Sequence, residues 1–411
     1  MKAQNQPTFP TRYSPVPKVP DKSLRLIGKY VIKGDPTPLP AHVDQLGHAL
    51  TEGDALADAW IATAATLPRA TAQKMFDDAL NKGIDTVENP PESLQKLFAQ
   101  VDHIPMWFDP YLMIKGAESA QRSGIIGELV LSTVSLMGGY LSAGAVKPLM
   151  FTGDLTSRAA DRVAETTQFV IDVNTPGELT RFGKGFKVAV RVRVMHAMVR
   201  RMILSSSKWQ TAAWGIPINQ GDLVGTNLLF SYTFMMSCRA LGMQYSAEER
   251  LSIIHLWRYV GYIMGISLDL LPATESEAAR LTYLMGITQL NPDKDSASLA
   301  RALHQVPLNR ARTPWQIKKA KLDMSFRTGL SRAILGDDRA DQLQLPDSLF
   351  KYSLVFLTPV IFTIELCRRL IPGGTRLAFI RGSRWQRNFT HRVTQGKQNT
   401  YQPVDELAVA E

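Results

Sequence analysis

The segment from Val188 to Leu204 constrains the fold more than any other part of the chain. Twelve of its seventeen residues are apolar, and the other five are Arg191, Arg193, His196, Arg200 and Arg201. A helix that is apolar around its whole girth belongs inside a large core. Residues 188–194 alternate in a way that favours a strand locally, but the apolar run continues to Leu204 without a turn signal. We therefore predict one helix over residues 185–205.

The cations of this helix need partners from elsewhere. A buried charge without a partner is very costly, and no Asp or Glu occurs from Leu179 to Gly221. The counter-charge must come from another segment or from a bound ligand. Arg193, His196 and Arg200 stand at positions i, i+3 and i+7, so they share one stripe of the helix.

Two interpretations of this stripe are open from the residues alone. A histidine nitrogen can ligate haem iron, and planar guanidinium groups on either side of it suit the propionate carboxylates of a haem. The alternative is a core histidine that is hydrogen-bonded to a carbonyl, with both arginines paired to acids of neighbouring helices. Spacing alone favours the alternative.

Helical periodicity dominates the rest of the chain. It covers residues 54–66, 70–82, 125–140, 156–173, 222–241, 247–270 and 275–286. We predict an all-α fold with one large helical domain over residues 46–372 and a core reminiscent of the globins. A proline-rich extended arm is expected at 1–45, and a polar, loosely ordered tail at 373–411.

Several classes of function are excluded by missing motifs. The sequence contains no GxGxxG dinucleotide loop, no phosphate-binding P-loop and no GxSxG element. Its two cysteines form no CxxC pair, which argues against a thiolate metal site. The net charge is +10, but the basic residues are not grouped with stacking aromatics, so we expect no nucleic-acid partner.

Two apolar stretches fall short of membrane spans. Residues 125–151 carry Glu128 and Lys147, and residues 352–366 are short and include Glu365. We predict that both are buried core helices. The first twenty residues have no apolar signal region, so a cytoplasmic location is expected, while the basic and apolar run at 368–372 leaves a peripheral membrane contact open.

A second polar stripe lies upstream of the first. Arg162, Glu165, Thr166 and Phe169 share one face of the helix predicted at 156–173. Polar groups opposite a haem can orient or deprotonate a bound species. The alternative is a surface pair between Arg162 and Glu165 or Thr166, which is the commoner situation for such a spacing.

Four motifs in this order resemble the DUF2236 family, which includes the latex-clearing rubber oxygenases and the MpaB oxygenases. They are residues 53–59 (GDALADA), the Arg193-x-x-His196-x-x-x-Arg200 element, residues 214–223 (WGIPINQGDL) and residues 257–266 (WRYVGYIMGI). The resemblance spans roughly residues 50–335.

The resemblance implies a helical fold with a buried pocket for haem b. His196 would be the iron ligand, and Arg193 and Arg200 would flank it. Arg327 and Arg332 are further candidates for contacts to the propionates. The implied activity is attack by O₂ on a hydrophobic, unsaturated molecule of isoprenoid or lipid-like character, including oxidative cleavage of its C=C bond.

The chain departs from the family pattern at two positions. Rubber oxygenases carry an Arg-x-x-Lys-Thr element upstream of the histidine, and here Arg162 and Thr166 match while the lysine has become Glu165. The glutamate base of those enzymes falls by spacing at Val146, beside Lys147. Rubber is therefore a doubtful substrate, and Glu165, Arg162 and Thr166 are the candidate catalytic residues. The alternative function is a non-catalytic haem- or lipid-binding protein with the same fold.

Overall fold

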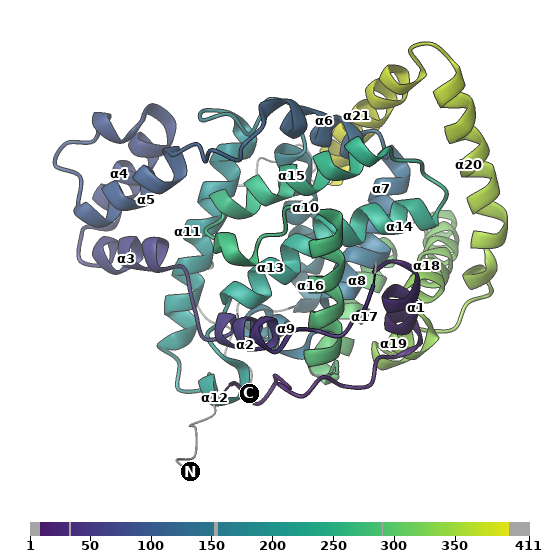
Figure 1. The fold of residues 1–411 in the computed structure, drawn as a ribbon, viewed down its shortest axis with the longest axis horizontal. Helices are drawn as coiled ribbons and strands as arrows, with labels where there is room; N and C mark the ends of the chain where they lie inside the picture. The colour runs from purple at the N-terminus through teal and green to yellow at the C-terminus, as the bar shows by residue number, and fades with distance from the viewer. Residues whose placement is uncertain (1–8, 33, 152–154, 290, 394–411) are drawn as a thin grey trace.

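The computed structural model describes residues 9–32, 34–151, 155–289 and 291–393 (Figure 1). Almost every element within these ranges is a helix, and the β-pairing found there is an isolated bridge between Tyr13 and Gln289. The prediction of a single all-α domain is confirmed.

The predicted extended arm contains helices, so that prediction is wrong for part of its length. Helix α1 (Lys22–Tyr30) begins where the Asp21 carboxylate accepts the backbone N–H of Leu24. Helix α2 (Pro40–Ala49) has proline in its first turn, where no hydrogen-bond donor is needed.

A lobe of three helices follows the arm. It consists of α3 (Ala55–Ala64), α4 (Arg69–Lys82) and α5 (Glu92–Asp102), with the 3₁₀ turn η1 (Ile84–Thr86) between the last two. Figure 1 shows this lobe at one end of the long axis of the molecule.

Helix α11 (Lys184–Leu204) organises the core, and it confirms the helix predicted at 185–205. Around it pack α3, α4, α9 (Ala143–Phe151), α10 (Leu155–Val173) and α15 (Ala247–Ile263). Helix α15 also lies along α6 (Pro110–Gln121). A Cβ atom on Gly116 of α6 would stand 2.2 Å from the Ser252 carbonyl oxygen of α15, so this close approach requires glycine.

Two long helices each contain a π-helical turn, and the two turns pack together. One helix comprises α7 (Gly124–Val130), η2 (Leu131–Ser135) and α8 (Leu136–Gly139), and the other comprises α13 (Gln220–Leu228), η3 (Leu229–Thr233) and α14 (Phe234–Ala240). The Ser135 hydroxyl donates to the Leu229 carbonyl at 2.8 Å. Such π-turns inside helices occur frequently at functional sites.

Further helices and turns complete the fold. They are α12 (Thr211–Trp214), η4 (Leu268–Leu270), α16 (Glu275–Thr288), α17 (Lys294–Arg310), α18 (Pro314–Leu335), α19 (Asp337–Gln342), η5 (Leu349–Tyr352), α20 (Leu354–Leu370) and α21 (Gly374–Val393).

In the described parts of the chain, no single helix combines the length and apolarity that crossing a bilayer requires. The bent pair Gly124–Gly139 and Ala143–Phe151, with 97° between them, meets that criterion jointly by length and composition. Val130, Val134 and Val146 of this pair are buried, as predicted for a core segment.

The prediction that residues 352–366 form a buried helix is wrong. Helix α20 lies at the edge of the molecule (Figure 1), and large apolar side chains such as Phe356 and Ile364 are exposed. The physical reason is that the charged residues Glu365 and Arg368 occupy the buried face instead.

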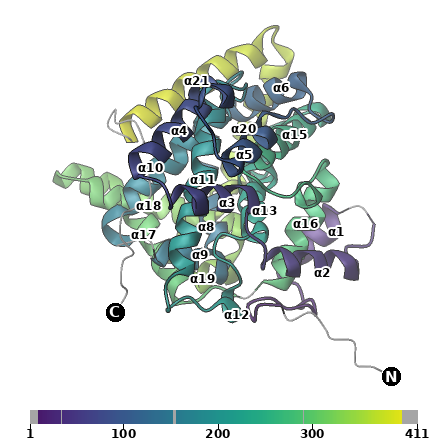
Figure 2. The same ribbon diagram turned by 90° about the vertical axis from the view of Figure 1, so that its left-hand side faces the viewer.

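The predicted loose tail is also wrong over residues 374–393. Helix α21 runs along the top of the molecule in Figure 2 and packs against α6, α7 and α10. Trp385 and Phe389 stack with their ring centroids 5.1 Å apart, and the Ser383 hydroxyl donates to the Gln121 side chain at 2.7 Å. These contacts hold the helix on the core, while residues 394–411 lie outside the described ranges.

Candidate functional site

The two polar stripes of the sequence lie on helices that pack against each other, α10 and α11. An ion pair of 2.9 Å between Lys184 and Asp172 ties the facing ends of these helices. Arg162 stands ten residues from Asp172, and His196 stands twelve residues from Lys184. At about 1.5 Å per residue, both lie roughly 15–18 Å along their helices from that ion pair. The fold therefore places the two stripes at about the same height along the packed helices α10 and α11.

Arg193 is fully paired within the protein. Its Nε and Nη2 atoms donate to the two carboxylate oxygens of Asp54 at 2.6 and 2.9 Å. Its Nη1 atom donates to the Ile263 carbonyl at 3.1 Å and to the side chain of Gln100. For this arginine the structure realises the alternative interpretation, in which an acid from a neighbouring helix supplies the counter-charge.

Gly265 makes room for that buried pair. Its φ of +79° lies in the left-handed region, and an added Cβ would stand 2.4 Å from Asp54 Oδ2 and 2.5 Å from Arg193 Nε. Only glycine fits there. The glycine of the 257–266 motif, the aspartate of the 53–59 motif and the arginine of the α11 stripe thus belong to one structural unit.

Arg200 differs from Arg193 in its hydrogen bonding. Its guanidinium group is buried, and its three nitrogen atoms have no hydrogen-bond partner among the described residues. Asp58 is its ion-pair partner, with an N–O separation of 3.4 Å. Burial lowers the pKa of Arg200 and raises the pKa of Asp58. Arg200 is therefore a buried cation that can still donate hydrogen bonds.

His196 lies one helical turn from Arg200 on the same stripe. Burial, followed by the positive charge of Arg200, lowers the pKa of the His196 ring to about 4. The side chain keeps some accessible surface, but its Nδ1 atom is buried and has no hydrogen-bond partner within the described residues. The imidazole is thus neutral at neutral pH and has a ring nitrogen available for a metal.

The donor set decides what kind of metal group fits here. The described ranges contain no cluster of three or more His, Cys, Asp or Glu side chains that could hold a bare metal ion. A site with one imidazole suits a metal that brings its other ligands with it, as haem iron does. A buried guanidinium with unused donors beside it suits a carboxylate. The donor chemistry of His196 and Arg200 therefore suits a haem, while neither of the two cavities described below has His196 in its lining.

Thr166 of the second stripe lines a small apolar cavity. The cavity has a volume of about 50 Å³, and α21 closes one side of it with Trp385 and Phe389. Glu165 is half-buried next to Thr166, while the side chain of Arg162 lies outside the described part of the structure. The roles predicted for these three residues stay predictions.

Arg327 and Arg332 already have protein acceptors on each nitrogen. Arg327 donates to Glu128 and Asp323 at 2.9 Å, and Arg332 donates to Asp337 at 2.8 Å and to Asp341 at 2.6 Å. The remaining nitrogen of Arg327 donates to Glu128 again, and the remaining nitrogen of Arg332 donates to the Pro346 carbonyl. The Arg332 nitrogen that donates to Asp341 also donates to the Leu345 carbonyl. Neither arginine has the unused donors that distinguish Arg200, so the structure gives no support to a propionate contact from either.

Sequence reasoning missed the acids that pair with the α11 stripe. Asp54 and Asp58 both belong to the 53–59 motif, at the start of α3. Their four-residue spacing matches one helical face and was the signal that could have paired them with Arg193 and Arg200. The contribution of α21 to the Thr166 cavity had no comparable signal.

Comparisons with known proteins agree with the helical fold. The family model for the catalytic domain of ER-bound oxygenase mpaB/B' and rubber oxygenase matches residues 125–357. A rubber oxygenase from Streptomyces sp. (strain K30) is 24% identical over 201 residues, which are 48% of this chain and 47% of that relative. The match therefore spans about half the length of the curated relative.

A solved structure has a similar fold. The structure of latex clearing protein LCP in the closed state aligns with a TM-score of 0.58 and 19% sequence identity, covering 83% of this chain and 91% of that chain. At this identity the likeness establishes the fold alone.

Proposed function

Because this chain belongs to the family of the mpaB and rubber oxygenase catalytic domain, we propose that it is a haem b-dependent oxygenase that acts with O₂ on a hydrophobic, unsaturated small molecule. One observation carries the proposal. A neutral imidazole with a ring nitrogen left unpartnered stands one turn from a buried guanidinium whose donors are unused, on a single rigid helix.

His196 would hold the haem iron and Arg200 would hold a propionate. Bound haem supplies an iron centre that can bind and activate O₂. Arg193 acts differently, since its bonds to Asp54 fix α11 against α3 and so orient the histidine stripe. Gly265 leaves room for the Arg193–Asp54 pair, because a Cβ atom at this position would collide with both side chains.

The residues of α10 would handle protons and orient the substrate. The Thr166 hydroxyl can donate one hydrogen bond and accept others. A carboxylate at Glu165 can accept a proton, whereas the lysine that it replaces in the family pattern can ligate a metal. Apolar side chains on α21 and η3 would exclude water from the substrate, because Trp385, Phe389 and Phe230 line the Thr166 cavity.

The haem proposal is tested by the absorption spectrum of the full chain, produced with a supply of iron and haem precursor. We expect a Soret band in the wild type and its loss in His196→Ala. His255→Gln is the matched control, because His255 Nε2 is occupied in accepting the backbone N–H of Asp109 at 2.9 Å. A wild-type protein without haem, or an unchanged Soret band in His196→Ala, contradicts the proposal.

A second candidate function is a haem- or lipid-binding protein without catalysis. The presence of Glu165 and of Val146, which is buried beside the Lys147–Asp293 ion pair, favours it. O₂ consumption by the haem-loaded protein, measured with isoprenoid and unsaturated lipid substrates, separates the two functions. Turnover on any of these supports the oxygenase, and a stable haem complex without turnover supports the binding protein.

A further inference from the structure

Helix α20 lies at the edge of the molecule, yet its buried face carries charged residues and its outward face is apolar. The face that meets the body contains Leu354, Leu357, Ile361, Glu365 and Arg368, and its two charged residues are buried. The outward face is apolar, with side chains 45–74% exposed: Val355, Phe356, Val360, Phe362, Ile364, Leu366 and Leu370. Exposed apolar surface of this extent marks a site of interaction.

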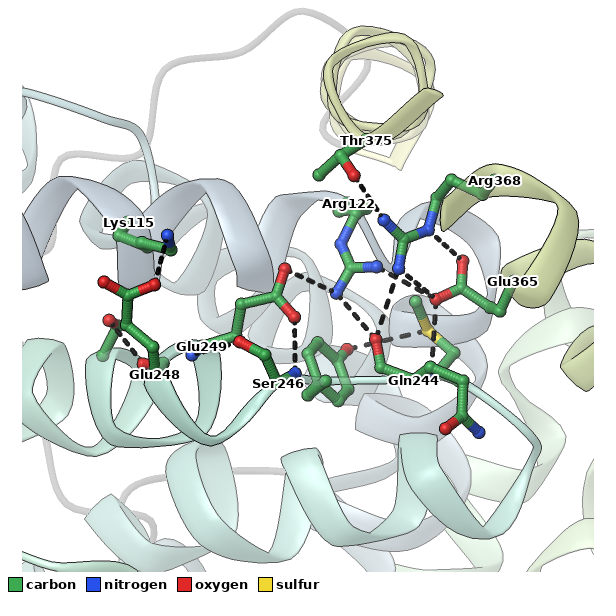
Figure 3. A network of polar contacts seen from close by, with 12 residues as sticks. Lys115, Arg122, Gln244, Ser246, Glu248, Glu249, Glu365, Arg368 and Thr375 are labelled. Carbon is green, nitrogen blue, oxygen red and sulfur yellow. Dashed lines mark hydrogen bonds and ion pairs between the residues drawn. The ribbon is translucent and has the colours of Figure 1, made fainter. Parts of the chain in front are cut away.

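A buried polar network holds α20 in this orientation (Figure 3). The Glu365 carboxylate accepts from Arg122 at 2.9 Å and from Arg368 at 3.0 Å, and it also accepts the backbone N–H of Gln244 at 3.2 Å. Arg368 donates further to the hydroxyl of Thr375 at 2.6 Å, which ties α20 to the start of α21. Turning the apolar face inward would break this network and strand buried charges, so the network opposes that rotation.

The surroundings of the apolar face are basic. From Lys351 to Arg387 the sequence has seven basic residues, and Glu365 is its single acidic residue. Since Glu365 is buried in the network, no carboxylate of this segment reaches the surface.

A groove of about 730 Å³ lies where α20 and α21 meet α6 and α15. Arg369, Arg376 and Lys115 line it, together with two acids, Glu118 and Glu249. Glu249 is paired with Arg122 at 3.3 Å, and Lys115 is paired with Glu248 at 2.6 Å. Arg369 and Arg376 then outnumber Glu118, so the balance of the remaining charge in the groove is positive.

We propose that α20 docks flat onto an anionic lipid bilayer, with its outward apolar side chains in the acyl boundary and Arg369 and Arg376 at the phosphate headgroups. At 17 residues the helix is about 25 Å long, which suits an orientation along the interface better than a crossing. Apolar residues on one face with basic residues beside them are the pattern of interfacial helices.

The charge pattern favours a bilayer over a second copy of this chain. A twofold pairing through α20 places the same patch on both partners, which brings the basic residues of the two copies near each other without acids to neutralise them. An anionic bilayer supplies the opposite charge. The proposal does not depend on haem or on catalysis.

Flotation of the full chain with two kinds of vesicle tests the proposal. One is phosphatidylcholine alone, and the other contains about one-third phosphatidylserine. We expect the wild type to float with the anionic vesicles and less so at high salt. Phe356→Ser/Val360→Ser/Leu370→Ser should reduce binding at least about tenfold, because three exposed side chains lose their transfer to lipid.

Matched control variants test whether binding depends on the position of the basic residues or only on the net charge. Arg369→Glu/Arg376→Glu should weaken binding to anionic vesicles about fivefold or more per arginine. Lys82→Glu/Lys96→Glu changes the net charge equally on the α3–α5 lobe, at the far end from α20 (Figure 1), and should bind as the wild type does. All the substituted side chains are exposed, so circular dichroism should show unchanged folding.

Cys367 allows the outer face of α20 to be labelled. It is exposed, whereas Cys238 is buried and burial raises the pKa of its thiol to about 12. A polarity-sensitive, thiol-reactive dye on Cys367 should shift to the blue with anionic vesicles. Failure of the wild type to float, equal flotation of the serine variant, or a concentration-dependent dimer that the serine variant abolishes without any flotation would overturn the proposal.

Discussion

Arg193 and Arg200 lie on the same stripe of α11, are equally buried and carry the same charge, yet their replacement should have opposite effects on the haem-free protein. We consider Arg193→Met and Arg200→Met, because methionine keeps most of the apolar stem and removes the guanidinium. Arg193 uses all three nitrogens on acceptors, while the nitrogens of Arg200 have no such partner among the described residues.

The expected free energies follow from what each change leaves behind. Arg193→Met strands the buried carboxylate of Asp54, and leaving a buried charge unpaired costs about 3–5 kcal/mol. Arg200→Met removes a buried group whose hydrogen bonds are unmade, and the Asp58 it leaves behind is partly solvated. A buried charged group without hydrogen bonds carries a desolvation cost that nothing offsets, so replacing it by an apolar side chain should leave the stability level or raise it.

Thermal unfolding of the haem-free variants measures the difference. An unfolding entropy of roughly 2 cal/mol/K per residue makes 1 kcal/mol worth about 1 °C in a chain of 411 residues. We therefore expect Tm to fall by about 3–5 °C in Arg193→Met and to stay level or rise in Arg200→Met. Haem binding should nevertheless weaken in Arg200→Met. Equal losses of Tm in the two variants would refute the reasoning, because they would show that the Arg200 guanidinium is satisfied without a ligand.

Three further predictions concern stability. Glu365→Ala removes the carboxylate that two buried arginines share and should lower the free energy of unfolding by about 3–5 kcal/mol, measured by urea denaturation with Glu365→Gln as the milder comparison. Gly242→Ala forces a side chain onto a φ of +101° and within 2.5 Å of the Thr358 carbonyl; the strain of about 1–3 kcal/mol should speed proteolysis of α20, and an unchanged rate would contradict it. Burial lowers the pKa of His255, which accepts the backbone N–H of Asp109. The unfolded chain therefore takes up the proton first as the pH falls below about 6.5, so stability should drop with acidification in the wild type and drop less in His255→Gln.

The fold class and the central helix could be predicted from the sequence because periodicity is a local property. The run from Val188 to Leu204 has too many apolar residues for a surface and no turn signal, so a buried helix follows from the chain alone. The exposure of the apolar face of α20 could not be predicted from local periodicity. Its composition is that of a core helix, and the buried ion network that turns its apolar face outward joins residues as far apart as Arg122 and Glu365.

At the candidate site, too, the sequence could not reveal which distant residues pair with the arginines of the α11 stripe. The sequence required counter-charges from outside residues 179–221, and the family resemblance named His196 as iron ligand with Arg193, Arg200, Arg327 and Arg332 as candidates for the propionates. Which of these arginines keep unused donors could not be read from the sequence.

By itself, then, the sequence determined that the chain is helical, that its centre is α11 and that the charges there need partners. Only the tertiary structure decided that Asp54, Gln100 and the Ile263 carbonyl together occupy the donors of Arg193, while the nitrogens of Arg200 keep no hydrogen-bond partner among the described residues. Hydrogen bonding depends on distances and angles between segments over a hundred residues apart, and no local pattern of residues encodes those.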